Sequence, residues 1–260
     1  MSSTNAEQPS ATLRALAIME TVARAEGPLA LTEIMSATSL PKPTVHRILA
    51  LLEGSGMLVR EPGGKRYGPG PRLSALALDV VSGAAWRAPR HAILQSVVDQ
   101  IGETCNLTML NGTDVVYLDR VEAAWPLRLH FQTGSRVPVH CSASGKLLLA
   151  LMPLRTRRRI VDTLPLPAYT PNTITARNVF EEALKRIRKD RFSTDNEEYL
   201  AGTVCVAVPV ENDKRCVPAV LAVHAPVTRM SLTQALAHVP TLRRAAALLV
   251  GTFPDASPPK

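Results

Sequence analysis

Pro41-Lys-Pro-Thr-Val-His-Arg-Ile-Leu-Ala-Leu-Leu-Glu-Gly54 is the stretch that decides the fold of the N-terminal part of this chain. Its apolar residues recur every three or four positions, which predicts a helix with one buried stripe. Proline is tolerated in the first turn, because those amides have no acceptor within the helix. The predicted buried stripe consists of Val45, Ile48, Leu49 and Leu52. The outer side, near the N-terminal end, carries Lys42, Thr44, His46 and Arg47.

Two shorter helices are predicted before this one. Residues 11–25 place apolar side chains at mixed three- and four-residue spacings, which is typical of an amphipathic helix, and Gly27-Pro28 ends it. A second helix is predicted to start at Leu31, with Thr32 as its N-cap. Ser39-Leu40 then supplies the turn into the next helix.

The sequence after Gly54 predicts a two-stranded hairpin, or wing. Residues 57–60 and 65–67 are the predicted strands, joined by a turn at Glu61-Pro-Gly-Gly64. Three helices followed by a wing form a winged helix-turn-helix, whose last helix reads bases while wing cations lie beside phosphates. A purely structural subdomain is the alternative. The candidate DNA-binding residues are Lys42, Thr44, His46, Arg47, Lys65 and Arg66.

Composition and charge agree with a DNA-binding protein of two domains. The chain has 260 residues, of which 46% are apolar and 20% charged, enough for two globular cores. The net charge of +8 favours a polyanionic partner. Residues 41–72 hold six Lys and Arg against two Glu, so the predicted recognition helix and wing lie in a basic segment.

Several classes of protein are disfavoured. No apolar run reaches the roughly 18 residues that span a bilayer, and the N-terminus lacks a secretory pattern, so we expect a cytoplasmic protein without a membrane partner. The four Cys include no C-x-x-C pair and the six His are scattered. We therefore expect reduced thiols, no metal site and no cofactor.

The predicted organisation is a polar tail over residues 1–10, a winged helix-turn-helix over 11–70, a linker helix over 71–85 and an α+β domain over 86–260. The apolar stripe of the linker, Leu73, Leu76 and Val80, needs a partner surface, which predicts a homodimer. The predicted strands of the α+β domain are Asn106–Leu110, Val115–Leu118, Leu127–Phe131, Val204–Val210 and Val217–Val223. Its predicted helices are Ala88–Gly102, Ser142–Met152, Asn178–Asp190 and Leu232–Leu249.

Several motifs along the chain resemble the isocitrate lyase regulator (IclR) family. They are Leu40–Leu49, Gly102–Leu107, Val115–Arg120, Gly134–His140 with Ser144-Gly-Lys146, and Asp195–Glu198 followed by Cys205–Pro209. The similarity covers residues 11–250. It implies a winged-helix domain, a linker helix and a GAF-like effector-binding domain, in a regulator or repressor that assembles as dimers or tetramers on operator DNA.

A helix start in the C-terminal domain is a candidate site for an acid. Ser142 is a good N-cap, and free amides at Ala143, Ser144 and Gly145 with the positive end of the helix dipole would accept a carboxylate. The resemblance places effector contacts at Leu129, Val137, Ala143, Ser144, Asp195, Thr203, Cys205, Ala222 and His224. Ordinary core packing is the alternative for Leu129 and Val137, and a buried inert thiol for Cys205.

The sequence departs from the simplest family pattern at two of these positions. Members that recognise very small keto acids have serine hydroxyls where this chain has Ala222 and His224. A His can pair with a carboxylate or phenol, and an Ala makes room. We therefore expect a larger organic acid, with aromatic acids among the candidates.

The same residues give less support to other functions. Asp195, Glu197 and Glu198 could be paired catalytic carboxylates, but they lie within four residues and no nucleophile motif accompanies them. We therefore expect no catalytic residues; the alternatives are an enzyme with an appended DNA-binding domain and a pure interaction module. The run Arg155-Thr-Arg-Arg-Arg159 resembles a nucleic-acid patch but is more typical of a solvated helix face or a protein contact.

Overall fold

The computed structural model describes residues 10–25, 27–61, 64–125, 136–212 and 216–253. The chain divides into two compact units, residues 1–80 and 81–260. No helix in the described ranges is long and apolar enough to cross a membrane.

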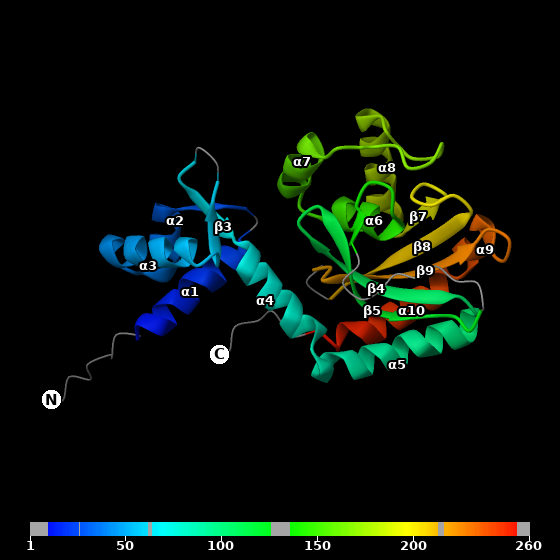
Figure 1. The fold of residues 1–260 in the computed structure, drawn as a ribbon, viewed down its shortest axis with the longest axis horizontal. Coiled ribbons are helices and arrows are strands. Elements are labelled where there is room, and N and C mark those ends of the chain that lie inside the picture. Colours follow the sequence, from blue (N-terminus) through cyan, green and yellow to red (C-terminus); the bar gives the residue numbers. More distant parts are fainter. Residues whose placement is uncertain (1–9, 26, 62–63, 126–135, 213–215, 254–260) are drawn as a thin grey trace. The chain divides into compact units, whose positions relative to one another are not determined.

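The first unit consists of three helices and a small sheet (Figure 1). Helix α1 spans Ala11–Arg24, α2 Leu31–Thr38 and α3 Lys42–Gly54. The strands β1 (Leu29–Ala30), β2 (Leu58–Arg60) and β3 (Arg66–Pro69) pair antiparallel in the order β1-β3-β2. This is the winged helix-turn-helix that the sequence predicts.

The core of this unit forms where the apolar stripe of α3 meets α1 and α2. Ile18 of α1, Ile34 of α2, and Val45 and Leu49 of α3 are each 0% exposed. The expected N-cap at Thr32 is wrong. The N-cap is Ala30, whose N–H donates to Glu33 Oε2 at 2.6 Å, so a carboxylate from the first turn caps α2 and Thr32 lies inside that turn.

Helix α4 (Pro71–Ser82) follows the wing, and α5 (Ala84–Ile101) begins after Gly83. The predicted linker of residues 71–85 therefore covers α4 and the first residues of α5. Leu73 packs against the core of the first unit. Leu76 and Val80 are 50% and 57% exposed, so none of the described residues covers this part of the stripe.

The second unit is built on one antiparallel sheet with the strand order β6-β5-β4-β9-β8-β7 (Figure 1). The predicted strands of residues 106–110, 115–118, 204–210 and 217–223 correspond to four of these six, whereas residues 127–131 lie outside the described ranges. The strands are β4 (Thr104–Asn111), β5 (Asp114–Val121), β6 (Arg136–Pro138), β7 (Ser193–Asn196), β8 (Thr203–Val210) and β9 (Ala219–Pro226).

Helices cover both faces of this sheet (Figure 1). One face carries α5 and α10 (Val239–Val250), and the other carries α6 (Ala143–Leu151), against which α8 (Arg177–Asp190) packs. The two remaining helices are α7 (Leu154–Thr163) and α9 (Leu232–Ala237).

Two expectations about these helices are corrected. The single helix expected over 232–249 is wrong, because it breaks at His238 and restarts as α10 with Pro240 in its first turn. A proline there cannot continue the preceding helix, since it lacks an N–H and its ring clashes with the turn before it. Helix α7 is not among the predicted helices; it contains the basic run Arg155–Arg159, for which the sequence favours a solvated helix face or a protein contact.

Strand β5 contains a bulge. Leu107 lies opposite Asp119 and Thr108 lies opposite Tyr117, so Leu118 is the extra residue. Tyr117 and Asp119 therefore point to opposite faces of the sheet, although residues two apart on a regular strand share a face. Asp119 contacts His91 of α5, with both carboxylate oxygens 3.2 Å from Nδ1.

Candidate nucleic-acid interface and ligand pocket

Helix α3 presents a polar outer face near its N-terminus. The buried apolar stripe that starts at Val45 fixes the rotation of the helix. As a result, Lys42, His46 and Arg47 are exposed and Thr44 is half-buried. Basic and hydroxyl side chains at the N-terminal end of such a helix can reach base edges and phosphates.

The two predicted wing cations differ in their surroundings. Lys65 is exposed. Arg66 is also exposed, but its guanidinium donates to the Pro28 carbonyl and to Glu33 Oε2, each at 3.0 Å. Both side chains of the Arg66–Glu33 pair are nearly half exposed, at 46% and 47%, so it contributes about 0–1 kcal/mol and a phosphate can replace Glu33.

The second unit contains a pocket of about 50 Å³ between the sheet and the N-terminus of α6. Seven strand and helix segments contribute to it, and its walls mix apolar side chains with a few polar groups, as in ligand sites. The lining residues are Asn106, Thr108, Val115, Tyr117, Val137, Ser142, Ala143, Ser144, Asp195, Tyr199, Leu200, Thr203, Cys205, Ala222 and His224.

Eight of the ten expected effector residues line this pocket, and two do not. Leu129 lies outside the described residues. Gly145 does not line the pocket, and the expectation of a free amide there is wrong, because its N–H donates to Ser142 Oγ at 3.2 Å. Sequence reasoning missed Asn106, Thr108, Val115, Tyr117, Ser142, Tyr199 and Leu200 as pocket residues.

The N-terminus of α6 faces the pocket with two unused backbone N–H donors. Ser142 caps the helix and also donates to the Pro138 carbonyl at 2.9 Å. Among the described residues, the N–H groups of Ala143 and Ser144 have no acceptor. They combine with the helix dipole, which favours an anion at this point.

His224 is neutral and has a fixed tautomer. Arg120 donates to Asn106 Oδ1 at 3.0 Å, so the Asn106 amide turns its NH₂ group toward His224 Nδ1, 2.8 Å away. Nδ1 therefore accepts a hydrogen bond and Nε2 carries the proton. Burial and the neighbouring cations of Arg120 and Arg229 lower the pKa of His224 to about 3. The pocket thus gains a neutral N–H donor.

Three pocket residues form one row across adjacent strands: Asp195 on β7 lies opposite Cys205 on β8, which lies opposite His224 on β9. Burial raises the pKa of Asp195 to about 7, although the Glu198 N–H donates to its carboxylate at 2.7 Å. Burial also raises the pKa of the Cys205 thiol, so it is inert as a nucleophile.

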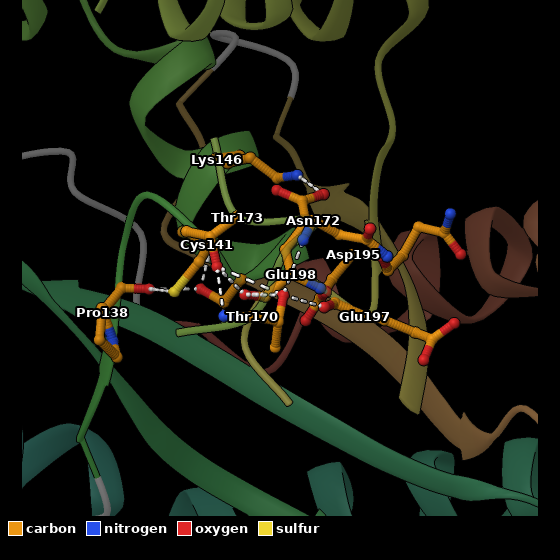
Figure 2. Close-up of polar contacts among 12 residues, drawn as sticks. Pro138, Cys141, Lys146, Thr170, Asn172, Thr173, Asp195, Glu197 and Glu198 are labelled. Carbon is orange, nitrogen blue, oxygen red and sulfur yellow. Dashed lines mark hydrogen bonds and ion pairs between the residues drawn. The ribbon is translucent and has the colours of Figure 1, made fainter. Parts of the chain in front are cut away.

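A buried ion pair joins α6 to the loop between β7 and β8 (Figure 2). Lys146 of α6 donates to Glu198 Oε1, while Oε2 has no partner among the described residues. Thr170 and Thr173 donate to the carbonyls of Glu197 and Glu198, each at 2.6 Å (Figure 2). These contacts hold the loop that carries Tyr199 and Leu200 over the pocket.

The three acidic residues near β7 do not form a hydrolytic pair. Glu198 is engaged by Lys146, and Glu197 accepts the N–H of Gly202 at 2.7 Å within its own loop. Only Asp195 lines the pocket. In the part of the chain that the structure describes, no group of three or more His, Cys, Asp or Glu could hold a metal ion.

Two family descriptions match the sequence. "Bacterial transcriptional regulator IclR C-terminal" matches residues 79–249, and "IclR helix-turn-helix domain" matches residues 11–62. The chain is 49% identical to "Probable transcriptional regulator SauR" of Cupriavidus necator, over 94% of this chain and 96% of that protein.

Solved structures agree in fold. The IclR structure of Thermotoga maritima matches with a TM-score of 0.61 and 26% identity, over 92% of this chain and 97% of that one. The inducer-binding domain of PobR from Acinetobacter, a double mutant in complex with 3-hydroxybenzoic acid, matches with a TM-score of 0.56 and 26% identity, over 61% of this chain and 94% of that one.

Proposed function

The chain belongs to the IclR family of bacterial transcriptional regulators, and from this premise we propose that a small organic acid, bound at the N-terminus of α6, controls how α3 and the wing bind operator DNA. The family assignment makes the chain a regulator and not an enzyme, so the alternative of an enzyme with an appended DNA-binding domain is set aside. Its effector-binding domain is the second unit.

The proposed DNA contacts divide into two groups. Lys42, Thr44, His46 and Arg47 of α3 are proposed to enter the major groove, where Arg47 reads a base. Lys65 and Arg66 are proposed to contact phosphates through the wing. Exposure of the polar face of α3 beside its buried stripe is the observation that supports this assignment.

The unused N–H groups of Ala143 and Ser144 carry the effector proposal. A carboxylate placed there meets two donors and the positive end of the α6 dipole. The rest of the ligand lies against Val115, Val137 and Ala222, and its far end reaches the Nε2–H of His224. An acid with an acceptor at its far end fits this arrangement.

We further propose that an aromatic hydroxy acid is such a ligand. A ring suits the apolar wall, a hydroxyl suits His224, and a related inducer-binding domain was solved with 3-hydroxybenzoic acid. The free volume of about 50 Å³ holds roughly four water molecules, so a ring enters only when the loop of Tyr199 and Leu200 moves outward. Leu200 is 38% exposed, which leaves it room to move.

We also propose that the functional unit is at least a homodimer. The exposed Leu76 and Val80 of α4 need cover, and a two-fold operator needs two recognition helices. Light scattering at micromolar concentration tests this, and a stable monomer would contradict it. The cytoplasm is the proposed location, since the partner is DNA.

One pair of measurements tests the effector site. Thermal unfolding with a panel of hydroxybenzoates and aliphatic acids finds the ligand, because a ligand at 100 times its Kd stabilises the protein by about 2.7 kcal/mol. Calorimetry then compares the wild type with Ser144→Glu, which places a carboxylate where that of the ligand should lie, and with Ser96→Glu, an exposed control on α5. Unchanged binding by Ser144→Glu would exclude this pocket.

The DNA-binding half of the proposal is tested separately. Selection of binding duplexes from a random-sequence pool with the full-length protein should recover one recurring site with two related halves. A protein that enriches no sequence contradicts sequence-specific binding.

A further inference from the structure

Most of the net charge of the chain lies outside the winged helix. Residues 1–80 hold eight Lys and Arg against seven Asp and Glu, whereas α7 and α8 together hold nine against four. These two helices therefore account for +5 of the total +8. A charge so concentrated creates a strong local field that attracts anions.

Helices α7 and α8 are neighbours in the second unit (Figure 1). A groove of about 280 Å³ runs between them, with Arg157 and Arg158 of α7 on one side and Lys185 of α8 on the other. Burial and the neighbouring cation of Arg188 lower the pKa of Arg157, which reflects the crowding of positive charge there.

Five cations on these two helices are exposed and have no hydrogen bond or ion pair among the described residues. We name them the α7–α8 cation surface. Its members are Arg155, Arg158 and Arg159 of α7 and Arg186 and Lys189 of α8. Acidic residues stand four positions from Arg158 and Arg186, but the described residues show no ion pair between them, so these cations stay available to a partner of opposite charge.

We propose that the α7–α8 cation surface binds the sugar-phosphate backbone of DNA that flanks the operator. Residues 155–159 span about 6 Å of helix, over which a DNA duplex presents roughly three to four phosphate charges. The winged helix tethers this second surface to the same duplex, so even weak phosphate contacts gain from a high effective concentration. The inference rests on the proposed operator binding.

Two other occupants fit the surface less well. A second copy of the chain in a two-fold contact would place the same cations against each other, which is repulsive. A protein partner needs apolar or aromatic anchors, but Phe180 is 0% exposed and only Leu154 and Val179, at 46% and 47%, offer large exposed apolar side chains on these helices. Phosphates need only cations.

The test compares two duplexes by fluorescence anisotropy with the full-length protein. The short duplex holds only the site recovered by selection, and the long duplex adds about one helical turn, roughly 10 base pairs, of random sequence on each side. The variant is Arg158→Gln with Arg159→Gln. The control is Arg244→Gln, which removes an exposed cation from α10 on the other face of the sheet, where its guanidinium contacts only Thr241 of its own helix.

We expect the α7 double variant to bind the long duplex about threefold or more weakly than the wild type, and to bind the short duplex with unchanged affinity. On the long duplex, the slope of log K against log salt concentration should decrease in magnitude by up to about 1.8 per protomer. The Arg244→Gln control should match the wild type on both duplexes. The inference is overturned if the α7 variant loses affinity equally for both duplexes, or loses none for the long one. It is also overturned if the control loses as much affinity, or if light scattering shows a changed oligomeric state. Wild-type protein that fails to bind the short duplex contradicts the proposed function instead.

Discussion

Lys146 and Glu198 form an ion pair beneath the loop that covers the pocket, with side chains only 4% and 10% exposed. Lys146 comes from the first turn of the helix whose N-terminus faces the pocket, and Glu198 from the loop that carries Tyr199 and Leu200. One contact thus joins the floor of the pocket to its cover.

Lys146→Met should destabilise the protein by about 3–5 kcal/mol, because it leaves the Glu198 carboxylate buried without a counterion. The double variant Lys146→Met with Glu198→Leu should recover most of this loss, since no charge remains to be buried. Urea unfolding of both variants measures the difference. A single variant as stable as the wild type would show that the pair is not desolvated.

Gly145→Ala should destabilise the second unit by about 1–3 kcal/mol, and more if the backbone cannot shift. A Cβ at this position would lie 2.4 Å from both Cα and O of Val139. Gly54→Ala is the matched control, because a Cβ there meets no atom within 4 Å. Thermal unfolding should separate the two variants, and equal melting temperatures would contradict the close approach of α6 to Val139.

Two buried groups should give stability opposite dependences on pH. The pKa of Asp195 rises from its ordinary 3.8 to about 7, so the stability from its protonated form is lost as pH increases from about 4 to 7. The pKa of His224 falls from its ordinary 6.5 to about 3, so its contribution is present above 6.5 and is lost as pH falls toward 3.

Between about pH 4 and 6.5 these two slopes oppose each other in the wild type. Asp195→Asn should therefore become more stable as pH rises through this window, and His224→Gln should become less stable. Urea unfolding at pH 4.5, 5.5 and 6.5 checks both variants. Parallel slopes for the two variants would mean that at least one of these groups titrates normally in the folded protein.

Arg47→Ala should lower affinity for the selected duplex by about 1–3 kcal/mol if Arg47 makes a bidentate base contact, and by less if it contacts phosphate. Titration on matched and scrambled duplexes distinguishes the two cases. Equal loss on both would remove Arg47 from the base-reading residues. No loss on either would count against α3 as the recognition helix.

Local patterns predicted the elements whose burial follows a simple period. The spacing of Val45, Ile48, Leu49 and Leu52 places α3 within one residue of its observed start, and Ser142 marks the start of α6. Helix α7 escaped prediction because only Val161 of its ten residues is fully buried, so no apolar stripe identifies it.

The pocket residues that sequence reasoning missed depend on contacts between distant segments. Tyr199 and Leu200 reach the pocket because Thr170 and Thr173 hold their loop from about 25 residues away. Tyr117 reaches it because its side of β5 faces α6, while the bulge at Leu118 turns Asp119 toward α5. Neither the hydrogen bonds from Thr170 and Thr173 nor the bulge leaves a periodic signal in the sequence.

The free N–H groups at the start of α6 belong to the main chain, so no substitution of a side chain other than by proline deletes them. The walls of the pocket, by contrast, are side chains such as Val137, Ala222 and His224. The preference for an acid and the preference for a particular shape of acid are therefore encoded separately. A lineage could exchange its inducer by a few substitutions on β6 and β9, while its attraction to carboxylates passed unchanged to the descendants.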